Sequence, residues 1–336
     1  MKSNRLGDGC MTSLKDIAKI AGVAKSTVSR YLNQGQVSEK TKEKIRQAIE
    51  ETGYRPNNLA RSLKSQSSKL IGVVIPRFDS GATSSVLKGL DQAAFQSGYQ
   101  LLIINSNLDR KREAENLKIL ANQKVAGIIL LASHLSPQLI QQIDQLPLPI
   151  IVLGQKADQL SYICHDDYQA GYKVASHLAD LNYQNIFYIG VSSKDPAVGI
   201  DRKKGFLESC NHYGQRVKVI QSNFSKEDNY KLAQKLLKDN LPATYIACAT
   251  DHMAIAFLKA AQELNYVIPD QLAISGFGGY NDFDYYYPGL TTVKYPYQES
   301  GTLAFHSLLD LISGQSSQVQ TVLDNQLLIR ESTQVK

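Results

Sequence analysis

Hydrophobic residues in the first part of the chain fall at the spacing of three short helices. The first apolar stripe occupies residues 14–21, where Ser13 can cap the helix start. A Gly-Val pair interrupts it, and a second stripe restarts over 25–32. A third runs from the cap Ser38 to a stop at Gly53. This spacing predicts a helix-turn-helix whose three helices close a small core.

A short amphipathic segment and a polar run follow Pro56. Residues 57–64 carry Leu59 and Leu63 at helical spacing, which predicts one further helix of two turns. Such a helix is too short to be stable alone. The run Ser-Gln-Ser-Ser at 65–68 indicates a linker. A domain boundary is expected there.

Beyond residue 70, short β-branched runs alternate with helical patterns. The alternation predicts a parallel sheet with helices on both faces, and its recurrence after Ser161 predicts two such doubly wound lobes. Ligands bind outside the carboxyl ends of such strands, so residues just past each strand are candidates for contact. The predicted strands are 70–75, 101–104, 127–131, 186–189, 217–220, 244–247 and 272–275, and helices of the first lobe are predicted over 84–97 and 111–123.

Positive charge is concentrated at the N-terminal end. Residues 1–69 hold 14 Lys and Arg against 6 Asp and Glu, whereas the remaining residues hold 23 against 25. A basic segment on a near-neutral body is typical of a nucleic-acid-binding module. A solvated basic surface would give the same count, so charge alone leaves both interpretations open.

Composition argues against membrane, secreted and metal-binding classes. The apolar runs end well before the roughly 18 residues that a membrane span needs. Residues 1–10 are polar and contain no apolar leader. The four cysteines lack CxxC spacing and indicate buried or idle thiols. We therefore expect a cytoplasmic protein without cofactor or metal.

An enzyme is the main alternative class, because doubly wound sheets host many activities. The chain contains no GxSxG elbow, P-loop or HExxH motif. The run Cys164-His165-Asp166-Asp167 has catalytic residue types, but neighbours on a strand alternate faces and do not converge. The run Gly276-Phe277-Gly278-Gly279 lacks the full GxGxxG spacing. We predict no enzymatic activity. A secreted sugar-binding protein would share the two lobes but lack residues 1–64.

Several motifs resemble those of the LacI/GalR-type bacterial repressors over nearly the whole chain from Met11. The motifs are Leu14-Lys15-Asp16-Ile17-Ala18, Ala21-Gly22-Val23, Ser26-Thr27-Val28-Ser29-Arg30-Tyr31-Leu32-Asn33, Gly53-Tyr54-Arg55-Pro56-Asn57, Ala60-Arg61-Ser62-Leu63, Arg202-Lys203-Lys204-Gly205-Phe206, Ala249-Thr250-Asp251 and Leu290-Thr291-Thr292-Val293. The resemblance implies a sugar-responsive transcriptional repressor. It also implies a homodimer that binds a pseudo-palindromic operator in double-stranded DNA.

The pattern and the resemblance together divide the chain into four segments. The fold class is a three-helix headpiece with a hinge helix, followed by two doubly wound parallel-sheet lobes of periplasmic-binding-protein type. We expect a disordered leader at 1–11, unless Met11 is the true initiator. The headpiece is expected at 12–56, the hinge helix and linker at 57–69, and an effector-binding and dimerisation domain at 70–336. Within that domain, lobe 1 is expected at about 70–161 and 292–320, and lobe 2 at about 162–290 and 321–332.

The resemblance assigns DNA contacts to the second helix and the hinge. One α-helix fits the major groove, where its first turn presents polar side chains to base edges. Lys25 and Ser26 match the positions that choose the operator, and Arg30 matches an arginine that reads a base. Leu63 matches a leucine inserted into the minor groove, unless it is a small core residue. The remaining implied contacts are Thr27, Ser29 and Asn33 to phosphates, together with Tyr54 and Asn57. Alternatively, Thr27 and Ser29 only solvate the helix and have no role in DNA binding.

Polar and aromatic residues after the strands predict a sugar site. Arg and Asp can hydrogen-bond vicinal hydroxyls, and an aromatic ring packs on a pyranose. By resemblance, Arg202 and Asp251 match effector-contacting or cleft positions, and Phe224 matches a stacking aromatic. A structural ion pair is the alternative for the arginine, and a core role for the phenylalanine. The other predicted contacts are Arg77, Asp79, Ser80 and Thr250.

The effector's charge is left open. Gly278 stands where many family members carry a sugar-binding Asp. Arg77 stands where the trehalose-repressor branch places a phosphate-binding arginine, whereas another basic residue of that branch is Gln155 here. We hypothesise a sugar or sugar phosphate related to sucrose or trehalose, with any phosphate against Arg77. The alternative is that Arg77 pairs with Asp79 or with an acidic residue of the facing lobe.

Overall fold

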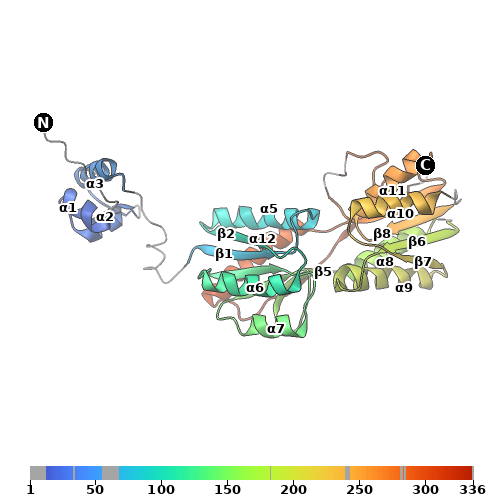
Figure 1. Ribbon diagram of the computed structural model, residues 1–336, viewed down its shortest axis with the longest axis horizontal. Coiled ribbons are helices and arrows are strands. Elements are labelled where there is room, and N and C mark those ends of the chain that lie inside the picture. Colours follow the sequence, from blue (N-terminus) through green and yellow to red (C-terminus); the bar gives the residue numbers. More distant parts are fainter. Residues whose placement is uncertain are drawn as a thin grey trace. The chain divides into compact units, whose positions relative to one another are not determined.

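The computed structural model describes residues 13–32, 35–54, 68–181, 183–238, 243–280, 283 and 285–334. The chain divides into two compact units, a headpiece within residues 1–68 and a larger unit at 69–336 (Figure 1). The expected leader at 1–11 and nearly all of the expected hinge at 57–69 lie outside the described residues.

The headpiece is a bundle of three short helices around a small apolar core. The helices are α1 (Leu14–Ile20), α2 (Lys25–Leu32) and α3 (Glu39–Thr52). The Asp16 carboxylate accepts hydrogen bonds from the Ser13 backbone N–H at 2.8 Å and its hydroxyl at 2.7 Å, which fixes the start of α1. Ile17, Val28 and Ile45, one from each helix, are fully buried against one another. The predicted helix-turn-helix is confirmed.

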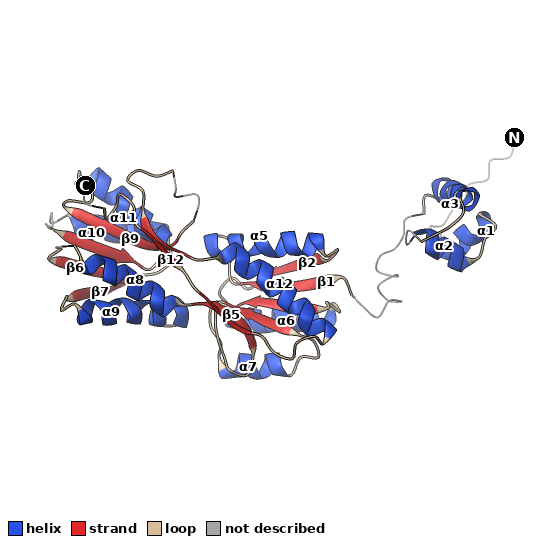
Figure 2. Cartoon of the chain, turned by 180° about the vertical axis from the view of Figure 1, so that it is seen from behind, coloured by secondary structure: helices blue, strands red, loops and turns tan. Residues whose placement is uncertain are grey.

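The larger unit consists of two lobes, each built on a six-stranded sheet (Figure 2). Lobe 1 has the strand order β11-β5-β4-β3-β1-β2, and every pair is parallel. Its elements are β1 (Leu70–Ile75), α5 (Gly81–Gln96), β2 (Gln100–Asn105), α6 (Arg110–Asn122), β3 (Gly127–Leu131), α7 (Pro137–Asp144), β4 (Ile150–Leu153), β5 (Ser161–His165), α12 (Tyr297–Ser313) and β11 (Gln320–Leu323).

Lobe 2 repeats this architecture with the order β12-β10-β9-β8-β6-β7. Only the β10–β12 pair is antiparallel among the strands described for this lobe. Its elements are α8 (Asp167–Ala179), β6 (Asn185–Gly190), a π-helical turn η1 (Ala197–Arg202), α9 (Lys203–His212), β7 (Val217–Gln221), α10 (Lys226–Leu237), β8 (Thr244–Cys248), α11 (Asp251–Glu263), β9 (Leu272–Gly278), β10 (Thr291–Lys294) and β12 (Gln326–Leu328).

The central strands read as continuous apolar runs because helices cover both faces of each sheet. Strands β3, β4 and β8 are buried along their whole length. In lobe 1, one apolar cluster packs under α5 and α12 and a second under α6 and α7. The predicted fold class of two doubly wound lobes is confirmed. Within the described ranges, every helix is too short or too polar to cross a membrane.

The chain crosses between the lobes a few residues later than expected. Strands β5 and β11 both belong to lobe 1, so the first crossing follows His165 and the third follows Leu323, not 161 and 320. Strand β10 pairs with β9 in lobe 2, so the second crossing lies after Lys294, not at 290–292. Strand pairing, which periodicity does not report, sets these positions. All three crossings gather at one junction between the lobes (Figure 2).

Candidate functional site

Helix α2 presents polar side chains on the face opposite the headpiece core. Lys25, Ser26 and Arg30 are exposed, whereas Val28 is fully buried and holds the helix in place. A hydrophobic anchor on one face therefore leaves the residues predicted to meet base edges free to contact a partner. Thr27 and Ser29 are half-buried at the sides of the same helix. Tyr54 is half-buried and packs against the core.

Gly35 lies against Arg30, a contact that the sequence pattern did not indicate. The Gly35 N–H donates to the Arg30 carbonyl at 2.9 Å. A Cβ at residue 35 would lie 2.6 Å from Arg30 Cγ, so glycine leaves room for the arginine stem. Asn33, Asn57 and Leu63, three predicted DNA contacts, lie outside the described residues.

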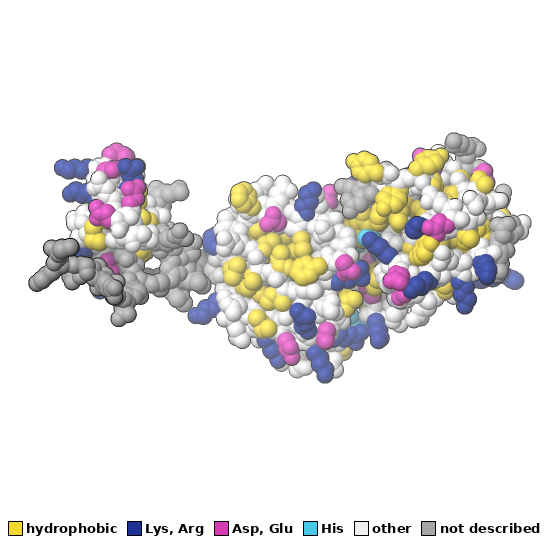
Figure 3. All heavy atoms as spheres, turned by 45° about the horizontal axis from the view of Figure 1, so that its top comes forward, with side chains coloured by type: hydrophobic (Ala, Val, Ile, Leu, Met, Phe, Trp, Pro, Cys, Tyr) yellow, Lys and Arg dark blue, Asp and Glu magenta, His cyan; other side chains and the backbone are white. Residues whose placement is uncertain are grey.

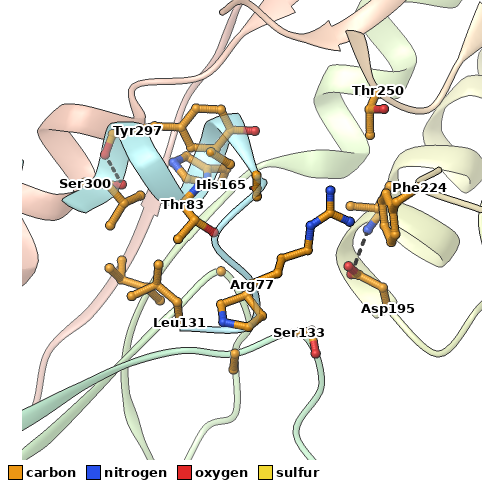
Figure 4. Close-up of a pocket in the computed structure, with 18 of the residues that line it drawn as sticks. Arg77, Thr83, Leu131, Ser133, His165, Asp195, Phe224, Thr250, Tyr297 and Ser300 are labelled. Atoms are coloured by element: carbon orange, nitrogen blue, oxygen red, sulfur yellow. Dashed lines mark hydrogen bonds between the residues drawn. The ribbon is translucent and has the colours of Figure 1, made fainter. Parts of the chain in front are cut away.

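A cleft opens between the two lobes at the carboxyl ends of their strands (Figure 4). Five predicted effector contacts line it, and two do not. The lining residues among the predicted contacts are Arg77, Ser80, Arg202, Phe224 and Thr250. Asp79 and Asp251 are absent from the lining. Topology explains the convergence, because strands of both parallel sheets end at this cleft.

Arg77 reaches across the cleft from the end of β1. Its Nε lies 2.9 Å from Asp79 Oδ1, and its guanidinium carbon lies 5.5 Å from the centre of the Phe224 ring in lobe 2. The Asp79 side chain is 81% exposed, so this ion pair is weak and water-screened. Ser80 has a structural role, because it caps α5 by accepting a hydrogen bond from the Thr83 N–H at 3.3 Å.

Arg202 lines the floor of the cleft and also forms a buried ion pair. Its Nε donates to Asp167 Oδ1 at 2.9 Å, and a second nitrogen lies 2.5 Å from the same oxygen. The remaining nitrogen donates to the Ala249 carbonyl, and the Tyr295 hydroxyl donates to Asp167 at 2.8 Å. Burial opposes the charge, but Asp167 more than offsets it, and the pKa of Arg202 lies above its ordinary value. The ion pair is therefore present, and the contact of Arg202 with an effector stays a prediction.

Asp251 accepts hydrogen bonds from other groups of the protein. It is fully buried and accepts from the Thr292 hydroxyl at 2.5 Å and from the Gly279 N–H at 2.7 Å. Burial raises its pKa to about 6, against the opposing effect of these hydrogen bonds. Its carboxylate ties the end of β9 to β10 and does not reach the cleft. Thr250 caps α11, accepting from the Met253 N–H at 3.3 Å.

The absence of an aspartate at residue 278 has a steric cause. Its φ is +153°, and a Cβ there would lie 2.5 Å from the Tyr280 ring and 2.9 Å from Asp251 Oδ2. The aromatic ring of Tyr280 lines the cleft and occupies the space that a side chain at 278 would need. An aspartate at residue 278 is therefore incompatible with this packing.

The cleft nevertheless contains a carboxylate, Asp195, which the sequence prediction missed. It follows β6 in lobe 2 and accepts from the Val198 N–H and from the Gln155 side chain of lobe 1, both at 3.2 Å. Gln155 also donates to the Ser133 carbonyl at 3.2 Å. Burial raises the pKa of Asp195, against the effect of its hydrogen bonds. Applying the strand-end rule to the predicted strand 186–189 would have found this residue.

Aromatic and imidazole groups line the side of the cleft nearest the lobe junction. Tyr280 stacks on Tyr297 with ring centres 6.0 Å apart, and His165 meets Tyr297 edge-on at 5.1 Å. Burial lowers the pKa of His165 to about 4, so the ring is neutral, and its Nε2 has no hydrogen-bond partner. The sequence predicted only that His165 lies at a strand end, and it does. Its neighbours in the sequence did not indicate that it lies beside the chain crossings between the lobes.

The arrangement suits a polyhydroxylated ligand better than chemistry on a substrate. Arg77 donors and the Asp195 acceptor face a space beside Phe224 (Figure 4). Tyr280 and Tyr297 also line this cleft. Across the described residues, no group of three or more His, Cys, Asp or Glu side chains is placed to hold a metal ion. Cys164, Cys210 and Cys248 are buried free thiols.

Comparison with known proteins places the chain in a family. A model described as bacterial regulatory proteins, lacI family, matches residues 13–57, and one described as periplasmic binding protein-like domain matches 175–333. The sucrose operon repressor of Staphylococcus xylosus is 34% identical over 314 residues, which cover 94% of this chain and 98% of that protein. The chain belongs to the lacI family of bacterial regulatory proteins.

Other relatives agree with this membership. The HTH-type transcriptional regulator RegA of Clostridium saccharobutylicum is 30% identical, over 96% of this chain and 99% of that protein. Among solved structures, the lac repressor dimer bound to operator and the anti-inducer ONPF shares the fold with a TM-score of 0.86, at 24% identity over 96% of this chain and 99% of that chain. This lacI-family member is a DNA-binding transcriptional regulator and not an enzyme, as its sequence predicted.

Proposed function

We propose that this lacI-family member represses a sugar-utilisation operon in the cytoplasm, and that a sugar bound between the lobes controls operator binding. The observation that carries the proposal is the cleft in which Arg77, Asp195 and Phe224 face one space, in a chain that also holds a helix-turn-helix. Sucrose or a related disaccharide such as trehalose is the proposed effector, since one relative is named as a sucrose operon repressor.

Helix α2 is the proposed recognition element in the major groove. The exposure of Lys25, Ser26 and Arg30 supports their role in reading bases. Thr27 and Ser29, half-buried on the flanks, suit contacts to phosphates, which set affinity and position more than sequence choice. The roles of Tyr54, Asn33, Asn57 and Leu63 stay predictions from the resemblance.

A homodimer is proposed through an apolar face that spans both lobes. In lobe 1, a groove beside the edge strand β2 is lined by Leu87, Tyr99 and Ile103, and Phe95 beside it is 84% exposed. In lobe 2, the loop after β9 exposes Tyr285, Tyr286 and Tyr287. Figure 3 shows hydrophobic side chains gathered on the face of lobe 1. An uncovered apolar edge strand is a typical interaction site.

Contacts across the cleft offer a route from sugar to DNA. The Arg77–Phe224 contact and the Gln155–Asp195 hydrogen bond both join lobe 1 to lobe 2. A sugar that inserts between these groups would favour one spacing of the lobes over another, and a paired dimer would pass that change to its headpieces. Whether the sugar releases DNA or strengthens binding follows from which spacing the operator-bound dimer prefers.

Footprinting on DNA upstream of the chain's own operon tests the proposal. We expect a protected pseudo-palindrome at low salt, with affinity falling steeply as salt rises through counterion release. A panel of mono- and disaccharides and their phosphates should contain at least one compound that shifts operator affinity. The absence of any protected site, or of any responsive sugar in the panel, would count against the proposal.

A further inference from the structure

Among the described residues, Asp195 is the one acidic residue that lines the cleft. Asp167 and Asp251 lie nearby, but the first is bound to Arg202 and the second to Thr292 and the backbone of Gly279. Neither lines the cleft. Of the acidic side chains, Asp195 is thus the one placed to meet a ligand.

Hydrogen bonds to one oxygen fix the Asp195 carboxylate, and the other oxygen is available to accept from a ligand. Oδ1 accepts both of its hydrogen bonds, from Val198 and from Gln155. Among the described residues, no hydrogen bond to Oδ2 exists, and no cation lies within ion-pair distance of Asp195. Figure 4 shows Asp195 beside Phe224, on the side of the cleft toward which Arg77 points. An anchored carboxylate with a spare acceptor oxygen is a typical partner of a ligand hydroxyl.

The charges of the cleft do not favour an anion. Asp79 partly offsets Arg77 at 2.9 Å, and Asp167 neutralises Arg202. Asp195 has no such partner, so a phosphate near Arg77 would also approach an uncompensated negative charge. Repulsion between like charges at short range in a partly buried site is substantial. The hypothesis of a sugar phosphate seated against Arg77 drew part of its support from the absence of a carboxylate at 278, and Asp195 supplies a carboxylate elsewhere in the cleft.

We propose that Asp195 binds effector hydroxyls in place of the carboxylate excluded at Gly278, and that it makes the cleft select a neutral disaccharide over its phosphate ester. The inference rests on the proposed function, because it requires a sugar effector. Arg77 then donates to hydroxyls on one side of the sugar and Asp195 accepts from hydroxyls on the other. The ring of Phe224 packs on the apolar face between them.

Calorimetry on the purified full-length protein tests this specificity, with sucrose and trehalose and their 6-phosphates as probes. We expect the wild type to bind one neutral sugar at least about tenfold more tightly than its phosphate ester. In Asp195→Asn, affinity for that neutral sugar should fall by about 10- to 100-fold, the usual cost of losing a charged hydrogen-bond partner. The preference over the ester should shrink by at least about tenfold, because the repulsion is gone.

Asp201→Asn is the matched control, since Asp201 lies in η1, the turn that follows Asp195, and its carboxylate does not line the cleft. It should leave both affinities within about twofold of the wild type. Operator affinity without sugar and the urea midpoint report whether each variant is folded. Asp195→Ser serves if the amide variant fails to fold, because its hydroxyl can still accept from the Val198 N–H.

The inference is overturned if the wild type prefers the phosphate ester, or if Asp195→Asn weakens neutral sugar and ester equally. It also falls if neither disaccharide pair binds. In that last case the proposed function is judged separately, by whether any other sugar of the wider panel shifts operator affinity. A responsive monosaccharide would preserve the proposed function while rejecting the disaccharide inference.

Discussion

Arg202 and Asp167 form a buried ion pair beneath the cleft, and its stability depends on both partners. The two side chains are 5% and 9% exposed, and Tyr295 adds a third polar group to the same carboxylate. Asp167→Asn should therefore lower the free energy of unfolding by about 3–5 kcal/mol, because it leaves the guanidinium charge buried without a partner. Urea denaturation measures the change. Lys173, which pairs with the 85% exposed Asp324, offers the comparison, since Asp324→Asn should cost less than about 1 kcal/mol.

Glu113 on α6 makes the stability of lobe 1 depend on pH. Its side chain is 4% exposed, and burial raises its pKa to about 7 from an ordinary 4.5. Between these values the folded protein binds more protons than the unfolded chain, so stability falls as pH rises and the penalty is complete above pH 7. Glu113→Gln should raise the free energy of unfolding at pH 8 by on the order of 2–3 kcal/mol and change it little near pH 4.5.

Urea titrations at the two pH values would show the difference directly, and Glu115→Gln, exposed on the same helix, should show none. An equal effect of Glu113→Gln at both pH values would mean that the carboxylate is not penalised by burial.

Residue type and strand-end position predicted which side chains approach the cleft, but not what each one does there. Arg77 and Phe224 meet in it as expected from their places after β1 and β7. Arg202 and Asp251 have the predicted chemistry, and each also bonds within the protein, Arg202 to Asp167 and Asp251 to Thr292. These partners are 35 and 41 residues away, so only the packed structure brings them together. Asp195 lies past the end of β6, where the strand-end rule could have found it, but its importance follows only from Tyr280 filling the space at 278.

The proposed DNA contacts of helix α2 are of two kinds. Ser26→Ala should change which operator sequence is preferred, because Ser26 is exposed in the first turn, where the proposal places contacts to base edges. Thr27→Ala should weaken binding to all sequences by a similar factor, since a phosphate contact carries no sequence information. Selection of preferred sites from a random pool, followed by gel shifts, distinguishes the two. The assignment fails if Thr27→Ala alters the selected sequence or Ser26→Ala leaves it unchanged while weakening binding.

Elements with strong periodicity were predictable, and those at sheet edges were not. The buried strands β1, β3 and β8 form continuous apolar runs, and the predicted ranges coincide with them to within a residue. Strand β11 is short and alternately exposed, so nothing in its local pattern assigns it to lobe 1. Its pairing with β5 decides that assignment, and with it the place of the third crossing.

At the scale of the whole molecule, the two lobes share one architecture but differ at their open edges. Strand β2 ends the sheet of lobe 1 and β7 ends that of lobe 2. The β2 edge borders an apolar groove with Phe95 beside it, whereas β7 carries Lys218 between its valines. Charged residues on an edge strand oppose pairing with another chain, and an apolar edge invites it. The difference between the edges is the physical reason for placing the dimer face on β2.

A matched pair of substitutions tests this placement, because each edge strand exposes one β-branched residue. Ile103 on β2 is 39% exposed and Val219 on β7 is 47% exposed. Ile103→Asp should shift the protein from dimer to monomer in sedimentation velocity, since a buried unpaired charge at an interface costs several kcal/mol. Operator affinity should fall with it, because a monomer meets only one half-site.

Val219→Asp introduces the same charge on the other edge and should leave mass and operator affinity unchanged. Dissociation caused by Val219→Asp, or a stable dimer of Ile103→Asp, would place the interface elsewhere. Sugar affinity measured on the same samples should stay within about threefold of the wild type in both variants, because neither residue lines the cleft.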